Sequence, residues 1–276
     1  MKGRYEKLNI EQVAYNLAVR ANTSLRQDVL FLLKNAYEQE RIGQVRKVLK
    51  IIIDNARIAR REGIAICQDT GLPLVFIEAG DVFISKRMLE SIHRGITAAY
   101  REEGFRSSTV NPFSDKTWPD PQIVHIEFVP RLKGIRLTVF PKGFGSENKS
   151  RLKMFNPTDS FDKICDFVVA SVKEAGPAAC PPFIIGIGIG GTSDYALYLA
   201  KKALLERVDR PNSDKTLDRW EKKILQAINS LKIGPMGMGG KFTALAVKIK
   251  IYPTHIAGLP VGVNISCHAL RSASAV

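Results

Sequence analysis

The sequence predicts an α/β protein of mixed α+β type, in which an N-terminal helical region precedes a mixed sheet with flanking helices. Two observations predict this class: apolar residues recur at helical spacing through residues 8–62, and further along the chain short apolar runs alternate with longer amphipathic stretches. The 276 residues, 45% of them hydrophobic, suffice for a large core. We expect one domain over residues 1–276, with 1–62 as a helical subregion.

The first part of the chain is predicted to hold two or three helices, a pair of short strands and a further helix. The apolar residues that mark the helical faces within 8–62 are Val13, Leu17, Leu30, Leu33, Val45, Val48, Leu49 and Ile52. Short strands are expected over 64–66 and 74–77, and a helix over about 86–103. The Pro-rich segment 112–121 is expected to be irregular.

The second part alternates strands and helices. The runs 123–128 and 135–140 are predicted to be strands that pair with each other, because both are apolar or alternate. A helix over 159–175 begins at Asp159 or Ser160 and closes at a Gly-Pro pair. The remaining expectations are a strand over 183–186, a helix over 193–208, a polar loop over 209–217, a helix over 218–231 and a strand over 242–252.

The charge of the chain and its lack of targeting segments exclude some classes of function. The formal net charge of +14 suggests nucleic-acid binding, but basic residues are interleaved with acids and no aromatic–basic platform accompanies them. We therefore expect solvated helix faces with some attraction for an anionic substrate, and no nucleic-acid partner. No run of eighteen apolar residues and no signal-peptide core is present, which predicts a cytoplasmic protein with no membrane partner.

Three of the four cysteines lie in turn-rich stretches far apart in the sequence. Cys67 is followed by Gln-Asp-Thr-Gly, Cys180 by two prolines, and Cys267 by a histidine. Three thiols brought together from distant loops would leave one corner of a cubic iron–sulfur cluster without a protein ligand. An iron with an open position is a Lewis acid for a hydroxyl or a carboxylate. Spacing alone leaves open the alternative of three small buried thiols.

The first of three glycine-rich stretches, residues 142–150, directly follows a predicted strand. Its glycines let the backbone approach a ligand closely, while Ser146, Asn148 and Lys149 offer donors to an anion. An ordinary turn with surface lysines is the alternative.

The other two stretches carry weaker signals. Residues 186–191 match the G-x-G-x-x-G spacing of a dinucleotide site, but no second parallel strand follows the next helix. We expect instead a tight strand-to-helix turn whose N–H groups suit a carboxylate. Residues 234–243 lead into a strand, and because a loop so rich in glycine seldom serves only to turn the chain, Lys241 and Thr243 are candidate polar site residues; a strained structural loop is the alternative.

Three further residues, two histidines and a cysteine, are interpreted from their sequence neighbours. His255, in a Pro-flanked turn, is the most plausible of the four histidines for an acid–base or substrate contact. His268 adjoins Cys267 and is expected only to shape its surroundings. Cys165 falls at helical spacing with apolar neighbours, which predicts a plain core thiol.

Five stretches taken together resemble the class I iron–sulfur hydro-lyases, the oxygen-sensitive fumarate hydratases and L(+)-tartrate dehydratases. They are residues 66–71, 141–150, 180–192, 234–243 and 258–267, in the same order as in the family. The resemblance runs from about residue 10 to residue 271.

The resemblance implies a 4Fe-4S cluster held by Cys67, Cys180 and Cys267, whose fourth iron binds substrate directly. It implies Asp69 as an acid–base group and His255 as a catalytic residue that contacts substrate. The substrate-binding residues that it implies are Gln68, Arg106, Gly143, Gly145, Ser146, Asn148 and Lys149. Of these, Arg106 rests only on its distance along the chain from Cys67.

The resemblance also implies a partner. Single-chain members of the family continue into a second domain with a threonine acid–base residue and further arginine and lysine anchors, whereas this sequence stops soon after Cys267. We expect the α subunit of a two-subunit enzyme, assembled as an α2β2 heterotetramer in which the β subunit supplies those groups.

The implied reaction is the reversible hydration of fumarate, a dicarboxylate, to (S)-malate. Dehydration of L(+)-tartrate to oxaloacetate uses the same machinery, and no motif separates the two. A different class of function is a non-catalytic iron–sulfur or zinc protein, which ligation by all four cysteines, including Cys165, would favour. A basic nucleic-acid-binding domain is the third alternative, and it would bind with steep salt dependence.

Overall fold

The computed structural model describes residues 9–106, 108–114, 116 and 121–276, which form two compact units. Unit 1 comprises Met1–Arg26, Ala56–Phe144 and Arg271–Val276; unit 2 comprises Gln27–Asn55 and Gly145–Leu270. Each unit combines helices with its own four-stranded sheet, which confirms the predicted α/β class. Residues 115 and 117–120 of the predicted irregular segment lie outside the described residues.

Three N-terminal helices confirm the prediction for residues 8–62. They are α1 (Ile10–Thr23), α2 (Gln27–Gln39) and α3 (Gly43–Glu62), and the division between the units falls within α3. The strand predicted over 64–66 is wrong. Ile64 is exposed, and the amide of Ile66 donates to the carbonyl oxygen of Asn22 at 2.9 Å, so this apolar run caps the end of α1 instead of joining a sheet.

The sheet of unit 1 has the strand order β2-β1-β3-β8. Its strands are β1 (Leu72–Ala79), β2 (Ile123–Phe128), β3 (Ile135–Lys142) and β8 (Ala273–Ala275). The predicted pairing of 123–128 with 135–140 is wrong, because β2 runs parallel to β1 and β3 runs antiparallel to its other edge. β1 is buried along nearly its whole length whereas β2 is largely exposed, so the more apolar strand takes the central position.

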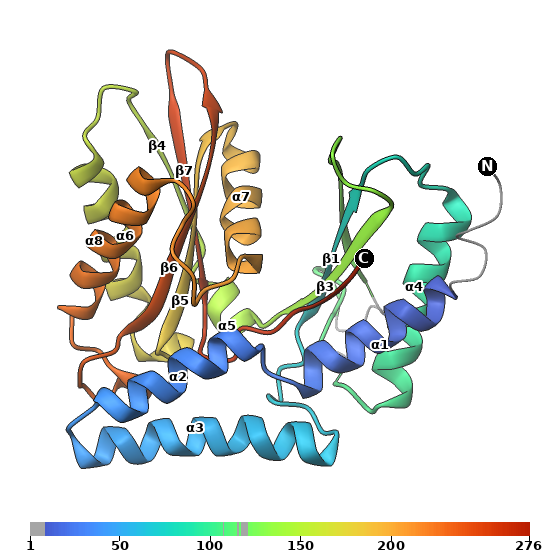
Figure 1. Cartoon of the computed structure of the whole chain (residues 1–276), viewed down its shortest axis with the longest axis horizontal. Helices are drawn as coiled ribbons and strands as arrows, with labels where there is room; N and C mark the ends of the chain where they lie inside the picture. Colours follow the sequence, from blue (N-terminus) through green and yellow to red (C-terminus); the bar gives the residue numbers. More distant parts are fainter. Residues whose placement is uncertain (1–8, 107, 115, 117–120) are drawn as a thin grey trace. The chain divides into compact units, whose positions relative to one another are not determined.

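One hydrophobic core holds unit 1 together. Helices α1 and α4 (Lys86–Glu102) pack against the sheet, as Figure 1 shows. Val75 and Ile77 of β1 and Val139 of β3 point into this core and meet Ile92 and Ile96 of α4, all of them 1% exposed or less. Full burial of such side chains stabilises a fold by about 1.5–3 kcal/mol each.

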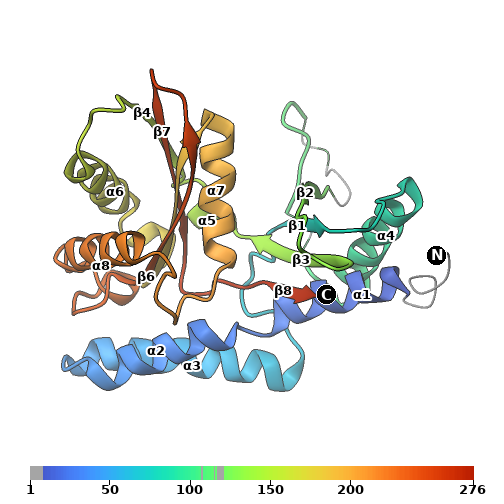
Figure 2. The same ribbon diagram turned by 45° about the horizontal axis from the view of Figure 1, so that its top comes forward.

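Unit 2 is a sheet with helices on both faces. Its strand order is β4-β7-β5-β6, with β4 (Arg151–Phe155), β7 (Leu259–Ser266), β5 (Phe183–Gly191) and β6 (Ala244–Thr254). Helices α6 (Phe161–Ala175) and α8 (Lys215–Asn229) cover one face, and α7 (Ser193–Leu205) covers the other (Figure 2). β5 pairs parallel with β6 and antiparallel with β7.

The glycine-rich run 186–191 belongs to β5, and the turn predicted there is wrong. A Cβ atom on Gly186 would lie 2.1 Å from the carbonyl oxygen of Ala200, and one on Gly188 would lie 2.0 Å from that of Ala196. These glycines therefore let the backbone of α7 pack directly on the strand. The alternating isoleucines of the run face the opposite core, so the run makes a buried strand and not a phosphate loop.

None of the helices in the described part of the chain is both long enough and apolar enough to cross a membrane.

Candidate active site

The turn of residues 67–71 in unit 1, called here the Asp69 turn, is held from several sides. The hydroxyl of Thr70, a residue that is 2% exposed, donates to the carbonyl oxygen of Arg106 at 2.7 Å. The hydroxyl of Tyr100 on α4 donates to the carbonyl oxygens of Thr70 at 2.8 Å and Gly71 at 3.3 Å. Gly71 has φ +75°, and a Cβ there would lie 2.9 Å from the backbone of Lys142, so only glycine fits.

The carboxylate of Asp69 joins this turn to the start of the first glycine-rich stretch. One oxygen accepts from the amide of Gly71 at 2.9 Å, and the other accepts from the amide of Phe144 at 2.7 Å. A Cβ on Gly143 would lie 3.1 Å from the second oxygen. The structure thus brings together Asp69 and Gly143, both of which the sequence predicted as site residues.

Gln68 lies in the Asp69 turn and Arg106 contacts it, and both residues are exposed to solvent. The backbone of Arg106 is tied to Thr70, and its side chain is exposed, as is that of Gln68. Arg106 also helps to line a cavity of about 20 Å³ with Gly71 and Tyr100. That volume suits about one water molecule and is too small for a four-carbon dicarboxylate.

Cys180 and Cys267 lie in neighbouring segments of unit 2. Cys180 follows the short 3₁₀ helix η1 (Pro177–Ala179) in a left-handed conformation, with φ 58°. Its carbonyl oxygen contacts His268 twice, accepting from the amide at 3.3 Å and lying 3.1 Å from Nδ1 of the ring. Burial lowers the pKa of His268, against the smaller raising effect of this contact with Cys180. A neutral imidazole that donates from Nδ1 therefore links the two cysteine segments.

The third glycine-rich stretch, residues 234–243, packs against the segment that contains Cys180. The amide of Met236 donates to the carbonyl oxygen of Pro181 at 2.9 Å, and a Cβ on Gly237 would lie 2.7 Å from the ring of Pro177. The hydroxyl of Thr243, a fully buried residue, accepts from the amides of Ile233 at 3.0 Å and Gly234 at 3.3 Å. Its side chain therefore serves the loop's own structure.

Lys241 has a similar structural place. Its amide donates to the carboxylate of Glu40 at 2.8 Å, and its Nζ donates to the carbonyl oxygen of Gln39 at 3.1 Å. Both contacts fasten the glycine-rich stretch to the end of α2. In the structure, Lys241 and Thr243 therefore both make hydrogen bonds that stabilise the glycine-rich stretch itself.

The later part of the first glycine-rich stretch rests on residues that sequence reasoning missed. Glu147 accepts from Nζ of Lys201 at 2.5 Å and from Nδ2 of Asn264 at 2.9 Å, and Asn264 also donates to the hydroxyl of Ser150 at 2.8 Å. Asn264 is fully buried within β7, three positions before Cys267. A lone amide inside the apolar run 261–265 was the signal that could have found it.

Four predicted binding residues lie along this supported stretch of unit 2. Ser146 is buried, Gly145 and Asn148 are exposed, and Lys149 is half-buried. Asn148 and Lys149 follow α5 (Phe144–Glu147), and the amide of Lys149 donates to the carbonyl oxygen of Ser146 at 3.1 Å. The exposed backbone and side-chain donors leave this stretch open to an anionic ligand.

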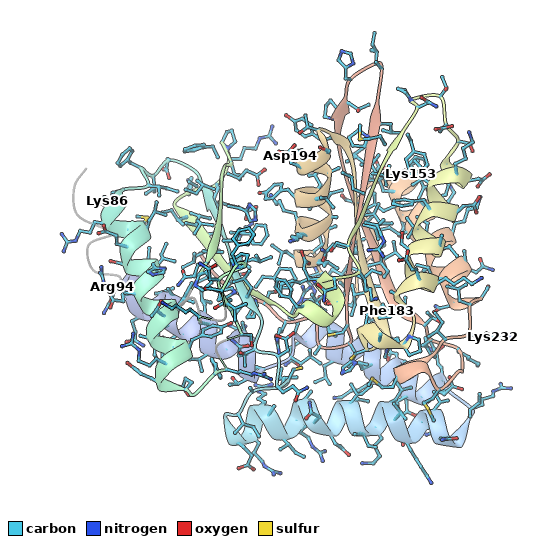
Figure 3. All side chains as sticks on the ribbon, turned by 180° about the vertical axis from the view of Figure 1, so that it is seen from behind. Lys86, Arg94, Lys153, Phe183, Asp194 and Lys232 are labelled. Carbon is cyan, nitrogen blue, oxygen red and sulfur yellow. The ribbon has the colours of Figure 1, made fainter. Side chains whose placement is uncertain are left out.

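His255 lies at the other end of unit 2 from the cysteines. It is exposed in the turn between β6 and β7, where its Nδ1 accepts from the amide of Ala257 at 3.2 Å. β7 has eight residues, which at about 3.4 Å per residue separate His255 from Cys267 by roughly 24 Å or more. Figure 3 shows the length of this unit along its strands, with the labelled residues Phe183 of β5 and Asp194 of α7 at opposite ends of the β5–α7 pair. The structure does not bring His255 together with Cys180 and Cys267.

Cys165 differs from the other three cysteines. It is 7% exposed on the side of α6 that packs into the apolar core, and burial raises the pKa of its thiol. Cys67, Cys180 and Cys267 are all half-buried, and none of the four, which all lie within the described residues, forms a disulfide. The prediction that Cys165 is a core thiol is confirmed.

The chemistry of the donors fits an iron–sulfur group better than a hard cation. Half-buried thiols that can ionise are the ligands of such clusters, whereas Mg²⁺ and Ca²⁺ prefer oxygen. Within either unit taken alone, the described His, Cys, Asp and Glu side chains include no group of three placed to hold a metal ion. Cys180 and Cys267 belong to unit 2 and Cys67 to unit 1.

Comparison with known proteins gives two kinds of match. A family model described as fumarate hydratase (Fumerase) matches residues 11–276. A Methanocaldococcus jannaschii protein named "Putative L(+)-tartrate dehydratase subunit alpha" is 41% identical over 275 residues, which cover 96% of each chain. The L(+)-tartrate dehydratase subunit alpha of Escherichia coli K12 is 24% identical over 268 residues, or 95% of this chain and 88% of that protein.

Proposed function

This chain belongs to the fumarate hydratase family, a family of hydro-lyases, and we propose that it is the α subunit of an iron–sulfur member that hydrates fumarate reversibly to (S)-malate. The family match extends over residues 11–276 and confirms the resemblance predicted from five sequence motifs. The observation that carries the proposal further is the contrast among the cysteines. Three are half-buried in turns inside the family motifs, and the fourth is buried in an apolar core.

We assign Cys67, Cys180 and Cys267 as the ligands of a 4Fe-4S cluster. Such a cluster, when bound by three thiolates, supplies an iron with an open coordination position that acts as a Lewis acid toward hydroxyl and carboxylate groups. The His268 contact with the Cys180 carbonyl supports this assignment, because it holds two of the three cysteine segments side by side. A cytoplasmic location is part of the proposal, since a reducing compartment keeps these thiols unpaired with one another.

The remaining predicted residues receive roles in binding and proton transfer. Arg106 and Lys149 carry positive charges that would bind substrate carboxylates, and the amides of the 143–148 loop would donate hydrogen bonds to charge that develops on them. Gln68, Ser146 and Asn148 offer further polar contacts. Asp69 would move the C3 proton, and its two backbone hydrogen bonds fix the direction of its carboxylate.

His255 is assigned a substrate contact on the resemblance to the family alone. Its distance from Cys267 along β7 makes this the assignment that most needs a direct test. His255→Asn keeps the size and one polar group of the side chain. If His255 contacts substrate, the variant should raise KM or lower kcat at least about tenfold, and unchanged kinetics would remove it from the site.

A partner subunit is the second part of the proposal. Relatives at 41% and 24% identity are named alpha subunits. On that basis we assign this chain a β partner that supplies the remaining acid–base group and carboxylate anchors, in an α2β2 assembly. Mass measurement of the co-expressed chains by light scattering tests the stoichiometry.

Tartrate dehydration is the second candidate reaction. The specific observation in its favour is that both relatives are named for L(+)-tartrate dehydratase. (S)-Malate and L(+)-tartrate share a four-carbon dicarboxylate skeleton and differ by one hydroxyl group, so the same cluster ligands and carboxylate anchors would serve both. The ratio of kcat/KM for fumarate, (S)-malate and L(+)-tartrate decides between them.

The decisive experiment is anaerobic reconstitution of the chain with its β partner, iron and sulfide, followed by assays with the three substrates. We expect an iron–sulfur absorbance band and hydro-lyase activity in the wild type. Cys180→Ser should abolish both, because a three-cysteine cluster loses a ligand. Cys165→Ser is the matched control and should leave the iron content and the activity nearly unchanged. A cluster that survives Cys180→Ser, or that is lost in Cys165→Ser, would contradict the ligand assignment.

A further inference from the structure

Arg271 is a buried cation beside the Asp69 turn that no motif singled out. It is 3% exposed and belongs to unit 1, the same unit as Asp69. Its Nη2 donates to the carbonyl oxygen of Asp69. Its Nη1 is buried and has no hydrogen-bond partner among the described residues.

The stability of the fold does not explain such a residue. Among the described side chains no ion pair joins Arg271 to a carboxylate, so its buried charge has no directly paired counter-charge. Burying an unpaired charge, or a donor without an acceptor, costs folding free energy. An apolar side chain of similar length would fill the space at a lower free-energy cost. The cost indicates that the guanidinium is retained for what it does to the turn.

The hydrogen bond from Arg271 to the Asp69 carbonyl oxygen differs from the other hydrogen bonds that hold the turn, because each of those involves another group. Tyr100 holds the carbonyl oxygens of Thr70 and Gly71, and the Thr70 hydroxyl holds Arg106. Within the described part of the chain, the Asp69 peptide oxygen accepts from Arg271 alone, while the Asp69 carboxylate is held at its other end by two amides. The backbone and the side chain of Asp69 are therefore held by separate contacts.

The charges of Arg271 and Asp69 both act on Tyr100. The positive charge of Arg271 lowers the pKa of Tyr100 and the negative charge of Asp69 raises it, while burial is the largest cause and brings that pKa to about 12. Tyr100 therefore stays a neutral donor to the turn at all ordinary pH values. Arg271 and Tyr100 therefore both contact the backbone of the Asp69 turn, and Tyr100 lies within the electrostatic influence of Arg271 and Asp69.

We infer that Arg271 is a positioning residue for the proposed reaction: by holding the Asp69 peptide, it fixes the direction in which the Asp69 carboxylate meets the substrate. The inference rests on the proposed function for the role of Asp69. Small displacements of a group that transfers a proton are costly, since about 1 Å can reduce the rate by roughly a hundredfold. Arg271 acts on the rate of the chemical step and not on substrate affinity.

The test compares Arg271→Met and Arg271→Lys in the reconstituted complex with the β partner. Methionine keeps the length of the side chain without charge or donor, and lysine keeps the charge and one donor. We expect Arg271→Met to lower kcat at least about tenfold with KM changed less than about threefold. Arg271→Lys should recover part of that loss. The matched control is Arg136→Met, which removes a guanidinium from the same unit, where it pairs with Glu78 at 2.9 Å.

A second readout does not depend on activity. Amide hydrogen exchange of the peptide that covers residues 67–72 should quicken in Arg271→Met and stay at the wild-type rate in Arg136→Met. If the wild-type complex shows no hydro-lyase activity, the proposed function fails, whereas this exchange experiment still decides whether Arg271 holds the turn.

Three outcomes would overturn the inference. Unchanged kcat in Arg271→Met would show that the contact does not matter for the reaction. A raised KM with unchanged kcat would make Arg271 a substrate anchor. Loss of the folded state in both variants, seen by circular dichroism, would make it a structural residue.

Discussion

At the scale of single residues, Glu40 shows how one carboxylate can hold a whole loop. It is 2% exposed, and it accepts from the amides of Arg41 at 2.8 Å, Ile42 at 3.1 Å and Lys241 at 2.8 Å. Burial raises its pKa, but the three N–H groups together outweigh burial and hold the pKa below its usual range. The glycine-rich stretch 234–243 therefore depends on an ionised group that lies about two hundred residues away in sequence.

Glu40→Gln should destabilise the chain at neutral pH by about 1–3 kcal/mol, because an amide nitrogen would face backbone donors and leave one unsatisfied. Since the pKa of Glu40 is lowered in the folded state, its stabilising effect is present above the pKa of the unfolded chain. That effect is lost as the pH falls through the lowered value. The gap between wild type and variant, measured by urea unfolding, should therefore close in acid. A constant gap from pH 7 to pH 3 would show that ionisation of Glu40 has no part in stability.

Tyr100 gives a prediction of opposite sign at alkaline pH. Its pKa is raised to about 12, so the folded state prefers the neutral phenol. Its contribution to stability is complete below the unfolded pKa of about 10 and disappears as the pH rises toward 12. Tyr100→Phe removes hydrogen bonds to the Asp69 turn and should cost about 1–2 kcal/mol at pH 7. The variant should then lose less stability than the wild type between pH 9 and pH 11, as thermal unfolding would show.

At the scale of elements, the packing of α7 on β5 sets the strictest limit on sequence. Gly186 and Gly188 meet backbone carbonyl oxygens of the helix, which cannot move without displacing the helix itself. The sequence pattern G-x-G-x-x-G was therefore informative about close packing and not about a nucleotide. Residue spacing alone does not distinguish the two uses of glycine, because both require a backbone without a Cβ.

Gly188→Ala should destabilise unit 2 by about 3 kcal/mol or more, since the new methyl group would lie 2.0 Å from the Ala196 oxygen. Gly43→Ala, at the first residue of α3, is the matched control, because nothing lies within 4 Å of the position that its new methyl group would take. It should change the free energy of unfolding by less than about 0.5 kcal/mol. Equal effects of the two variants in chemical unfolding would contradict the packing role of β5.

Elements with strong periodicity were predictable, and those defined by their neighbours were not. The helices of residues 8–62, α4 and α6, and the strands β1, β2 and β3 follow from apolar spacing within each segment. β4, β7 and β8 were missed because each is short or glycine- and proline-containing, and becomes a strand only beside a partner. The pairing of β2 with β1 likewise depends on burial of the whole sheet, which no single segment encodes.

The candidate site divides in the same way. Cys67, Asp69 and Gly143 were predicted from sequence motifs and the family resemblance, and the structure adds the contact between Asp69 and Phe144 that joins two of those motifs. Glu147, Lys201, Asn264 and Arg271 were missed. Their importance comes from contacts with residues distant in sequence, such as Arg271 with Asp69, and charged side chains are common enough that none stands out alone.

At the scale of the whole molecule, each unit is assembled from separate stretches of the chain. Residues 271–276 return to unit 1, where β8 pairs with β3 and the hydroxyls of Thr138 and Ser274 lie 2.8 Å apart. Ala273 joins the core of unit 1. This last stretch therefore completes both the sheet and, through Arg271, the support of the Asp69 turn.

Removal of residues 271–276 should loosen unit 1 and leave unit 2 intact. Amide exchange in β3 should rise by at least about tenfold, because its edge loses its partner strand, whereas β5 and α8 should exchange at the wild-type rate. Removal of Val276 alone is the control, since that residue is 80% exposed and lies beyond β8. Equal exchange in both shortened chains would show that β8 does not stabilise unit 1.

Because unit 1 is built from separate stretches of the chain, it cannot be completed early during synthesis on the ribosome. A chain emerges from its N-terminus, and domains generally fold as their residues become available. β1, β2 and β3 are made early, yet Arg271 and β8 follow only after residues 145–270, which belong to unit 2. The nascent chain must therefore carry an incomplete sheet with an open β3 edge while residues 145–270 are translated. Such an edge is a site where chaperones bind or neighbouring chains aggregate, so the yield of this protein in cells should depend on how quickly residues 271–276 follow.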